Sequence, residues 1–262
     1  MVNKAKTAQI FLDLIDIIAR LRAPDGCPWD REQTHESLLP YFLEEAYEVI
    51  ESVELKNWET LKEELGDVLL HVLLQAQIAK ESNKFDIIDT INGINGKLIK
   101  RHPHVFDNKK KENSLQTKKD WEAQKHTEKN RESRLDGVPS KLPALVRAQR
   151  LQEKASYAGF DWDEIDGAWG KLDEELKELK QAQELGEIEN IKEEIGDVLF
   201  SVVNLSRFFN VAAEDMLRQS NRKFIRRFKK IEQKLKEEGK KIEDSTLKEM
   251  GIIWEQAKKQ NL

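Results

Sequence analysis

The chain has 262 residues, of which 39% are hydrophobic and 35% charged, and its formal net charge at pH 7 is −5. This acidic balance argues against nucleic-acid binding. The chain has a single cysteine, Cys27, which excludes an intrachain disulfide. It also lacks any run of 18 apolar residues, which argues against a membrane span. We therefore expect a soluble, cytoplasmic protein of one or two domains, with neither a nucleic-acid nor a membrane partner.

The first part of the chain is predicted to form a series of helices. Apolar residues recur at helical spacing over residues 4–21, and the sequence RAPDG then ends the helix. A tight loop, CPWD, follows at residues 27–30. Further helices are expected at residues 35–53, 58–80 and 85–100, and the last of them ends at a loop with the sequence RHPHVF.

The second part is predicted to be helical as well. A lysine-rich polar linker covers residues 108–140, with a helix around residues 118–129. Helices are then expected at 141–155, 165–183, 188–209 and 213–238, and a short one around Trp254 closes the chain. Because no segment of useful length alternates like a strand, the predicted fold class is all-α.

A repeat fixes the domain organisation. Residues 44–72 align with residues 174–202 at a constant offset of 130, and 14 of the 29 positions are identical. Each copy contains the motifs E-E-x-x-E and E-E-x-G-D on two helical segments joined by a short break. The repeat predicts two tandem related helical-bundle domains, at residues 1–107 and 141–262. Because each half buries only a modest core, dimerisation is expected to complete the bundles.

The repeated acids share one side of each helix. With Leu172 at zero on a helical wheel, Glu175 and Glu178 lie at about −60° and −120°, beside the apolar stripe. Glu194 and Asp197 take the same position on the next helix, and the first copy repeats the register. Short connections make the two helices of each copy antiparallel neighbours. Four carboxylates are therefore expected to meet at one edge of each helix pair.

Such a gathering of like charges predicts a metal site. Carboxylates beside a core repel one another unless cations neutralise them, and all-oxygen ligand sets suit Mg²⁺ or Mn²⁺. One acidic motif alone is typical of a solvated helix face, but the same register on four helices favours metal binding. The predicted ligands are Glu45, Glu48, Glu64 and Asp67 in the first half and Glu175, Glu178, Glu194 and Asp197 in the second.

A basic stretch, NRKFIRRF, lies on the last long helix. Lys223, Arg226 and Arg227 share one face of it, while the two phenylalanines are expected in the core. By default such a basic face is solvated. Beside a carboxylate–metal site it gains a second interpretation, because metals together with fixed cations are what polyphosphate binding needs. Trp254 is interpreted either as a core residue or as a platform for a flat ring.

The chain as a whole resembles the MazG family of nucleoside triphosphate pyrophosphohydrolases in its tandem two-domain form. The resemblance depends on CPWDREQTHESLLPYFLEEAYE, the duplicated acidic motifs, RHPHVF, VPSKLPALVRAQRLQEKASYAGFDW and NRKFIRRF. It implies an all-α homodimer that binds ATP and other nucleoside triphosphates and hydrolyses them to the monophosphate and pyrophosphate with Mg²⁺. Such enzymes are usually interpreted as removing aberrant nucleotides from the pool.

The resemblance also implies site residues. The metal ligands carried over are those predicted above. Because the first half lacks a counterpart of Trp254, the resemblance implies that the second half, residues 141–262, is the main catalytic half. The implied substrate contacts are Lys171, Glu174, Asn190, Lys192, Glu193, Lys223, Arg226, Arg227 and Trp254.

The expected mechanism is attack by water on the α-phosphorus, with pyrophosphate as the leaving group. Glu174 or Glu193, acids outside the predicted ligand set, would orient this water or take its proton. A di-iron bundle is excluded because it needs Glu-x-x-His, and His71, four residues after Asp67, is replaced by Ser201 in the second copy. The remaining alternative is a non-catalytic, metal-stabilised helical interaction or regulatory module, in which the basic helix binds a partner.

Overall fold

The computed structural model describes residues 3–106, 114–128 and 131–260, and within these ranges all regular structure is helical. The all-α prediction is therefore confirmed. The chain divides into two compact units, Met1–Lys111 and Glu112–Leu262. No single helix in the described ranges is long and apolar enough to cross a membrane; α10 (Ile188–Phe208) and α11 (Ala213–Glu237) meet that test only as a pair, which is bent by 105°.

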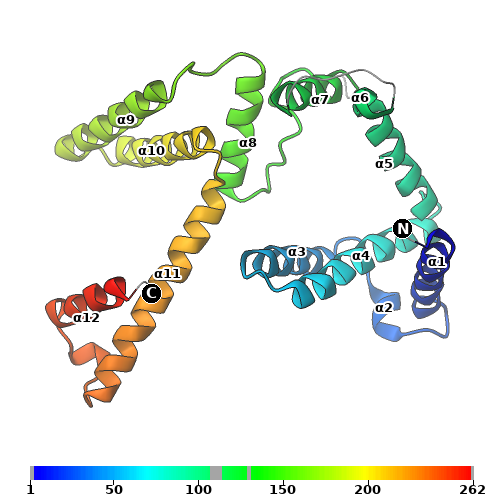
Figure 1. Ribbon diagram of the computed structural model, residues 1–262, viewed down its shortest axis with the longest axis horizontal. Coiled ribbons are helices and arrows are strands. Elements are labelled where there is room, and N and C mark those ends of the chain that lie inside the picture. The colour runs from blue at the N-terminus through cyan, green and yellow to red at the C-terminus, as the bar shows by residue number, and fades with distance from the viewer. Residues whose placement is uncertain (1–2, 107–113, 129–130, 261–262) are drawn as a thin grey trace. The chain divides into compact units, whose positions relative to one another are not determined.

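Unit 1 is built around the antiparallel pair α3 and α4 (Figure 1). Its helices are α1 (Lys4–Leu21), α2 (Pro28–Glu32), α3 (Leu39–Glu54), α4 (Trp58–Glu81), α5 (Ile87–Arg101) and α6 (Pro103–Phe106). Helix α1 packs on α4, and the core between them consists of Ile18, Leu38, Leu73, Leu74 and Ile78. Asn57 caps α4 by accepting a hydrogen bond from the Thr60 amide.

Proline explains where short helices replace predicted loops. The segment CPWD and the segment after His102 were expected to be loops, but Pro28 and Pro103 each begin a short helix. A proline lacks the amide hydrogen that the first helical turn leaves unbonded, so this position suits it. Pro40 likewise lies in the first turn of α3, which begins at Leu39 rather than near residue 35.

Unit 2 contains a matching helix pair, α9 (Ile165–Leu185) and α10 (Ile188–Phe208), which lie side by side in Figure 1. Helix α8 (Ala144–Tyr157) packs across α10, and α11 (Ala213–Glu237) leaves the pair. A 3₁₀ turn (Ile242–Asp244) and α12 (Leu247–Lys259) follow, and α12 packs on the far part of α11 through Ile231, Leu235 and Ile253. We call α11 and α12 together the C-terminal arm.

The repeat extends to the turn inside each helix pair. Lys56 and Gly186, which are related by the offset of 130, both have a left-handed backbone, with φ of 55° and 72°. Glycine adopts this conformation without strain, whereas a residue with a Cβ does so less readily. The same chain reversal therefore sets the relative direction of both acidic helix pairs.

The predicted linker, residues 108–140, is partly helical. Its residues 108–113 and 129–130 lie outside the described residues, and α7 (Ser114–Glu128) lies between them. Glu122 of α7 forms an ion pair of 2.9 Å with Lys154 of α8. Part of the predicted linker therefore packs within unit 2, and the domain limits of 1–107 and 141–262 stay a prediction.

Candidate metal centres and substrate site

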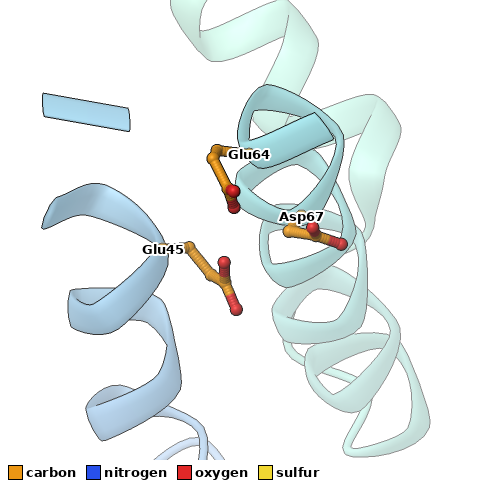
Figure 2. Close-up of side chains that lie close together, drawn as sticks. All are labelled: Glu45, Glu64 and Asp67. Atoms are coloured by element: carbon orange, nitrogen blue, oxygen red, sulfur yellow. The ribbon is translucent and has the colours of Figure 1, made fainter. Parts of the chain in front are cut away.

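The first acidic cluster comprises Glu45 on α3 and Glu64 and Asp67 on α4. Each offers one carboxylate oxygen, and these oxygens all lie within 4.8 Å of one another. Figure 2 shows the carboxylates of Glu45 and Glu64 in the space between the two helices and that of Asp67 beside them on α4. All three side chains are half-buried, so the cluster is shielded from bulk water without being closed to ligands.

The carboxylates of the first cluster repel one another. Burial, followed by the charges of Asp67 and Glu48, raises the pKa of Glu45 to about 7. Burial and the neighbouring Glu48 also raise the pKa of Glu64. Without a cation, the cluster therefore holds a proton that an isolated glutamate would release.

In the absence of divalent cations, we expect the free energy of unfolding to fall as the pH rises from about 4.5 to about 7. Glu45 keeps its proton to about pH 7 in the folded state, against 4.5 for an ordinary glutamate. The folded state then binds more protons than the unfolded state in this window, and raising the pH removes that advantage. The share due to Glu45 is about 1–2 kcal/mol once solvent screening is taken into account.

Urea unfolding in EDTA across this pH range measures the effect. Glu45→Gln cannot titrate, so its profile should be flatter than that of the parent chain. Saturating Mg²⁺ should also flatten the parent profile, because a cation favours the deprotonated carboxylates. Identical profiles for the parent chain and Glu45→Gln would contradict the prediction.

The second acidic cluster comprises Glu175 on α9 and Glu194 and Asp197 on α10, again with one oxygen each within 4.8 Å. Glu175 is only 5% exposed, whereas Glu194 is half-buried and Asp197 exposed. Burial, then the charges of Glu178 and Glu175, raises the pKa of Glu194. The two units therefore present the same trio of acids at equivalent positions.

The fourth acid of each predicted set lies outside the trio. Glu48 and Glu178 are exposed and do not belong to the mutually close groups. They remain near enough to raise the pKa values of Glu45 and Glu194. Each predicted four-carboxylate site is therefore three converging acids with a fourth at its edge.

Lys171 distinguishes the second cluster from the first. Its ammonium lies 2.7 Å from a carboxylate oxygen of Glu175 and 2.8 Å from one of Glu174, and these bonds, that to Glu174 first, raise its pKa. The position related by the repeat offset is Tyr41, which carries no charge. The second cluster thus has a cation from its own chain. The family resemblance implied Lys171 as a substrate contact. Its pairing with Glu175 was not predicted, although the i, i+4 spacing of these two residues was a visible signal.

The other predicted contacts on α9 and α10 do not belong to the trio. Glu174 is exposed and pairs with Lys171. The Asn190 amide donates to Glu187 at 2.6 Å, and Lys192 pairs with Glu189 at 2.7 Å. Glu193 is exposed and does not belong to the trio. None of these residues supplies an oxygen to the close group of three.

The predicted basic and aromatic contacts lie on the C-terminal arm. The Arg227 guanidinium lies 5.5 Å from the centroid of the Trp254 ring, and Phe224 packs 5.3 Å from the same ring. Phe224, expected in the core, is 57% exposed. Helix α12 packs against α11, and Figure 1 shows it apart from α9 and α10. Within one chain, the described structure does not bring Lys223, Arg226, Arg227 or Trp254 to the acidic cluster.

The residues of both trios fit a divalent cation. Each trio supplies oxygen ligands from two facing helices, which is the donor type that Mg²⁺ and Mn²⁺ prefer. The raised pKa values of Glu45, Glu64 and Glu194 indicate negative charge that the protein itself leaves insufficiently compensated. Binding of a hard cation would relieve this repulsion in both units.

Comparison with known proteins identifies the same two regions. The model of the MazG nucleotide pyrophosphohydrolase domain matches residues 33–106 and 169–232. A Thermotoga maritima protein, nucleoside triphosphate pyrophosphohydrolase/pyrophosphatase MazG, is 48% identical over 95% of this chain and 96% of its own length. The nucleoside triphosphate pyrophosphohydrolase of Escherichia coli K12 is 39% identical over 95% and 97%, respectively. The Bacillus subtilis protein YabN is 45% identical over 92% of this chain and 50% of its own length.

Proposed function

The chain belongs to the MazG family of nucleotide pyrophosphohydrolases, and from that premise we propose a divalent-cation-dependent attack of water on the α-phosphorus of its substrates. It is an enzyme that hydrolyses nucleoside triphosphates to the monophosphate and pyrophosphate. The observation that supports the metal-dependent mechanism is the convergence of three carboxylates within 4.8 Å in both units.

In unit 2, Glu175, Glu194 and Asp197 would hold Mg²⁺ or Mn²⁺, with Glu178 at the edge of the site. When bound, the cation supplies positive charge for the phosphate oxygens and makes water a stronger acid. Glu174 or Glu193, which are exposed beside the trio, would orient the attacking water and accept its proton. Lys171 lies between Glu174 and Glu175, so its ammonium is in place to offset phosphate charge as well.

We propose that the working form is a homodimer. Ile195 and Leu199 on α10 and Phe224 and Ile225 on α11 are each about half exposed, which leaves apolar faces uncovered on both the acidic pair and the arm. Lys223, Arg226 and Arg227 carry positive charge beyond the single cation, Lys171, that pairs with Glu175 in the acidic cluster. A second copy's arm would cover the acidic pair and bring these cations, with Trp254, to the triphosphate.

The proposed setting is the cytoplasmic nucleotide pool. A net charge of −5 suits free nucleotides bound through metal ions better than nucleic acid, and neither a nucleic-acid nor a membrane partner is proposed.

For unit 1, a structural role is the second candidate. Its described residues include Asn95, Lys97 and Arg101, which have the same spacing as Asn221, Lys223 and Arg227 in the basic stretch of unit 2. Arg101 is buried on α5, so this residue is poorly placed to meet a phosphate.

Product analysis tests the proposed function. With Mg²⁺, ATP, dITP and dUTP should each yield one pyrophosphate and one monophosphate, and EDTA should stop the reaction. For attack on the α-phosphorus, reaction in ¹⁸O-water should place the label in the monophosphate. Orthophosphate as the product, or label in pyrophosphate, would contradict the mechanism. A non-catalytic helical module would release neither product.

A further inference from the structure

Lys171 places a positive charge on one of the three acids that are proposed to hold the cation in unit 2. It lies on α9 one helical turn before Glu175, and its Nζ is 2.7 Å from a carboxylate oxygen of that residue. The Glu175 side chain is only 6% exposed, whereas that of Lys171 is 39% exposed. The ammonium therefore reaches from the surface to a carboxylate that is buried within the unit.

This ion pair compensates the charge of Glu175 in the absence of a metal ion. A buried carboxylate loses the hydration that stabilises its negative charge, so it needs a close cation or hydrogen-bond donors. Glu194 differs in this respect, because within the described part of the chain its buried Oε2 has no hydrogen-bond partner. Lys171 thus satisfies one acid of the trio and leaves a buried oxygen of another available to a metal ion.

The ammonium of Lys171 and a divalent cation would compete for the same carboxylate. Two cations that approach one carboxylate repel each other, and the ammonium already contacts an oxygen of Glu175. Coordination of a metal ion by the whole trio is therefore favoured when Lys171 releases Glu175. The flexible four-carbon stem of the lysine permits this movement. Glu174, whose carboxylate lies 2.8 Å from the same ammonium, keeps it near the site.

Comparison with unit 1 shows that the helix pair does not need this lysine in order to form. Tyr41, which is related to Lys171 by the offset of 130, carries no charge, and its ring centroid lies 6.0 Å from that of Trp29. Glu45, the counterpart of Glu175, nevertheless converges with two acids of α4. The lysine is therefore a feature of the second cluster alone, and a role in its ligand binding explains it better than a role in helix packing.

We infer that Lys171 is a counter-ion that leaves Glu175 when the metal-bound triphosphate binds and then contacts the phosphate oxygens. Before binding, the ammonium holds Glu175 and opposes the binding of a metal ion alone. After binding, the same ammonium stabilises the metal–triphosphate complex. The second cluster therefore selects a metal ion that is bound to a triphosphate over a free one. The inference depends on the proposed function, because Glu175, Glu194 and Asp197 must hold the cation.

Calorimetric titration of the full chain tests this exchange. Every sample carries Asp67→Ala, which removes the contribution of the first cluster, and adding Asp197→Ala measures the binding that does not involve the second. Lys171→Met keeps a side chain of similar length without the charge. It should bind Mn²⁺ alone about three- to tenfold more tightly than the Asp67→Ala chain. It should bind the complex of Mn²⁺ with α,β-methylene-ATP, which lacks the hydrolysable link, about tenfold more weakly.

The opposite signs of the two changes are specific to an exchange. An ammonium that stayed on Glu175 would oppose both ligands, so its removal would tighten the binding of both. A lysine that only contacted phosphate would leave the affinity for Mn²⁺ alone unchanged. Either of these results would overturn the inference. As a matched control, Lys177→Met removes a positive charge from the opposite, exposed face of α9, and it should leave both affinities within about twofold.

Failure of the proposed function gives a different result. In that case Asp197→Ala would leave the binding of Mn²⁺ unchanged, and the chain without substitutions would release no pyrophosphate from ATP. Failure of the inference alone would leave both of these properties intact and change only the response to Lys171→Met. Circular dichroism of each variant confirms that it is folded before its affinities are compared.

Discussion

Glu175→Ala and Asp197→Ala should each lower the rate of pyrophosphate release from ATP by about a thousandfold or more. Each substitution removes one of the three carboxylates that converge within 4.8 Å in unit 2, so the cation and the phosphates it positions lose a fixed ligand. Glu175 is the more demanding test, because it is 5% exposed and also pairs with Lys171.

The folded state should survive both substitutions. Removing one of several mutually repelling carboxylates relieves the repulsion that raises the pKa of Glu194. Circular dichroism should show unchanged helix content in both variants, and thermal unfolding of Asp197→Ala in EDTA should show equal or higher stability. Turnover near that of the parent chain in both folded variants would contradict the proposed metal site.

Matched controls separate this effect from a general loss of acidic charge. Glu189→Ala removes an exposed acid that pairs with Lys192 on the same helix, and it should leave turnover within about twofold. Glu45→Ala and Asp67→Ala make the corresponding changes in the first cluster. If unit 2 is the main catalytic half, their effect on turnover should be much smaller than that of Glu175→Ala.

The helices and both acidic pairs could be predicted because local signals determine them. Hydrophobic spacing predicted α9, α10 and α11 to within two residues at each end, at Ile165–Leu185, Ile188–Phe208 and Ala213–Glu237. The repeat carried the acid register from one unit to the other, and the left-handed turn at Lys56 and Gly186 followed the same offset. Periodicity and duplication were therefore sufficient to predict that Glu45 lies near Glu64 and that Glu175 lies near Glu194.

The remaining features depend on contacts that periodicity does not specify. A helical wheel places both Glu175 and Glu178 beside the apolar stripe of the helix. It does not show that, of these two residues, only Glu175 is buried. The direction in which α11 leaves the bundle depends on tertiary contacts, which the sequence pattern does not reveal. For this reason NRKFIRRF was expected beside the acids, whereas within one chain it lies on the C-terminal arm. The side-chain amide of Gln152 donates a hydrogen bond to the Phe200 carbonyl, 48 residues further along the chain. No local pattern encodes that pairing.

Mixing two inactive variants should restore activity if the arm acts across a dimer. The first variant, Asp197→Ala, keeps the basic arm but lacks one acid of the cluster. The second, Lys223→Ala with Arg226→Ala, keeps the acids but lacks two cations, and alone it should lose about a hundredfold in turnover. Both carry Asp67→Ala, so that the first cluster does not contribute.

Coexpression of the two variants should recover about a quarter of the activity of the Asp67→Ala parent. Random pairing makes half of the dimers mixed, and each mixed dimer has one site with intact acids from one copy and an intact arm from the other. If the arm instead folded back onto its own chain, no site in the mixture would be complete and activity would stay at the level of the separate variants. The expected recovery of activity therefore follows from the arrangement within unit 2. There, α12 packs on α11 and lies away from the acidic helix pair, so the arm is left to act on a second copy.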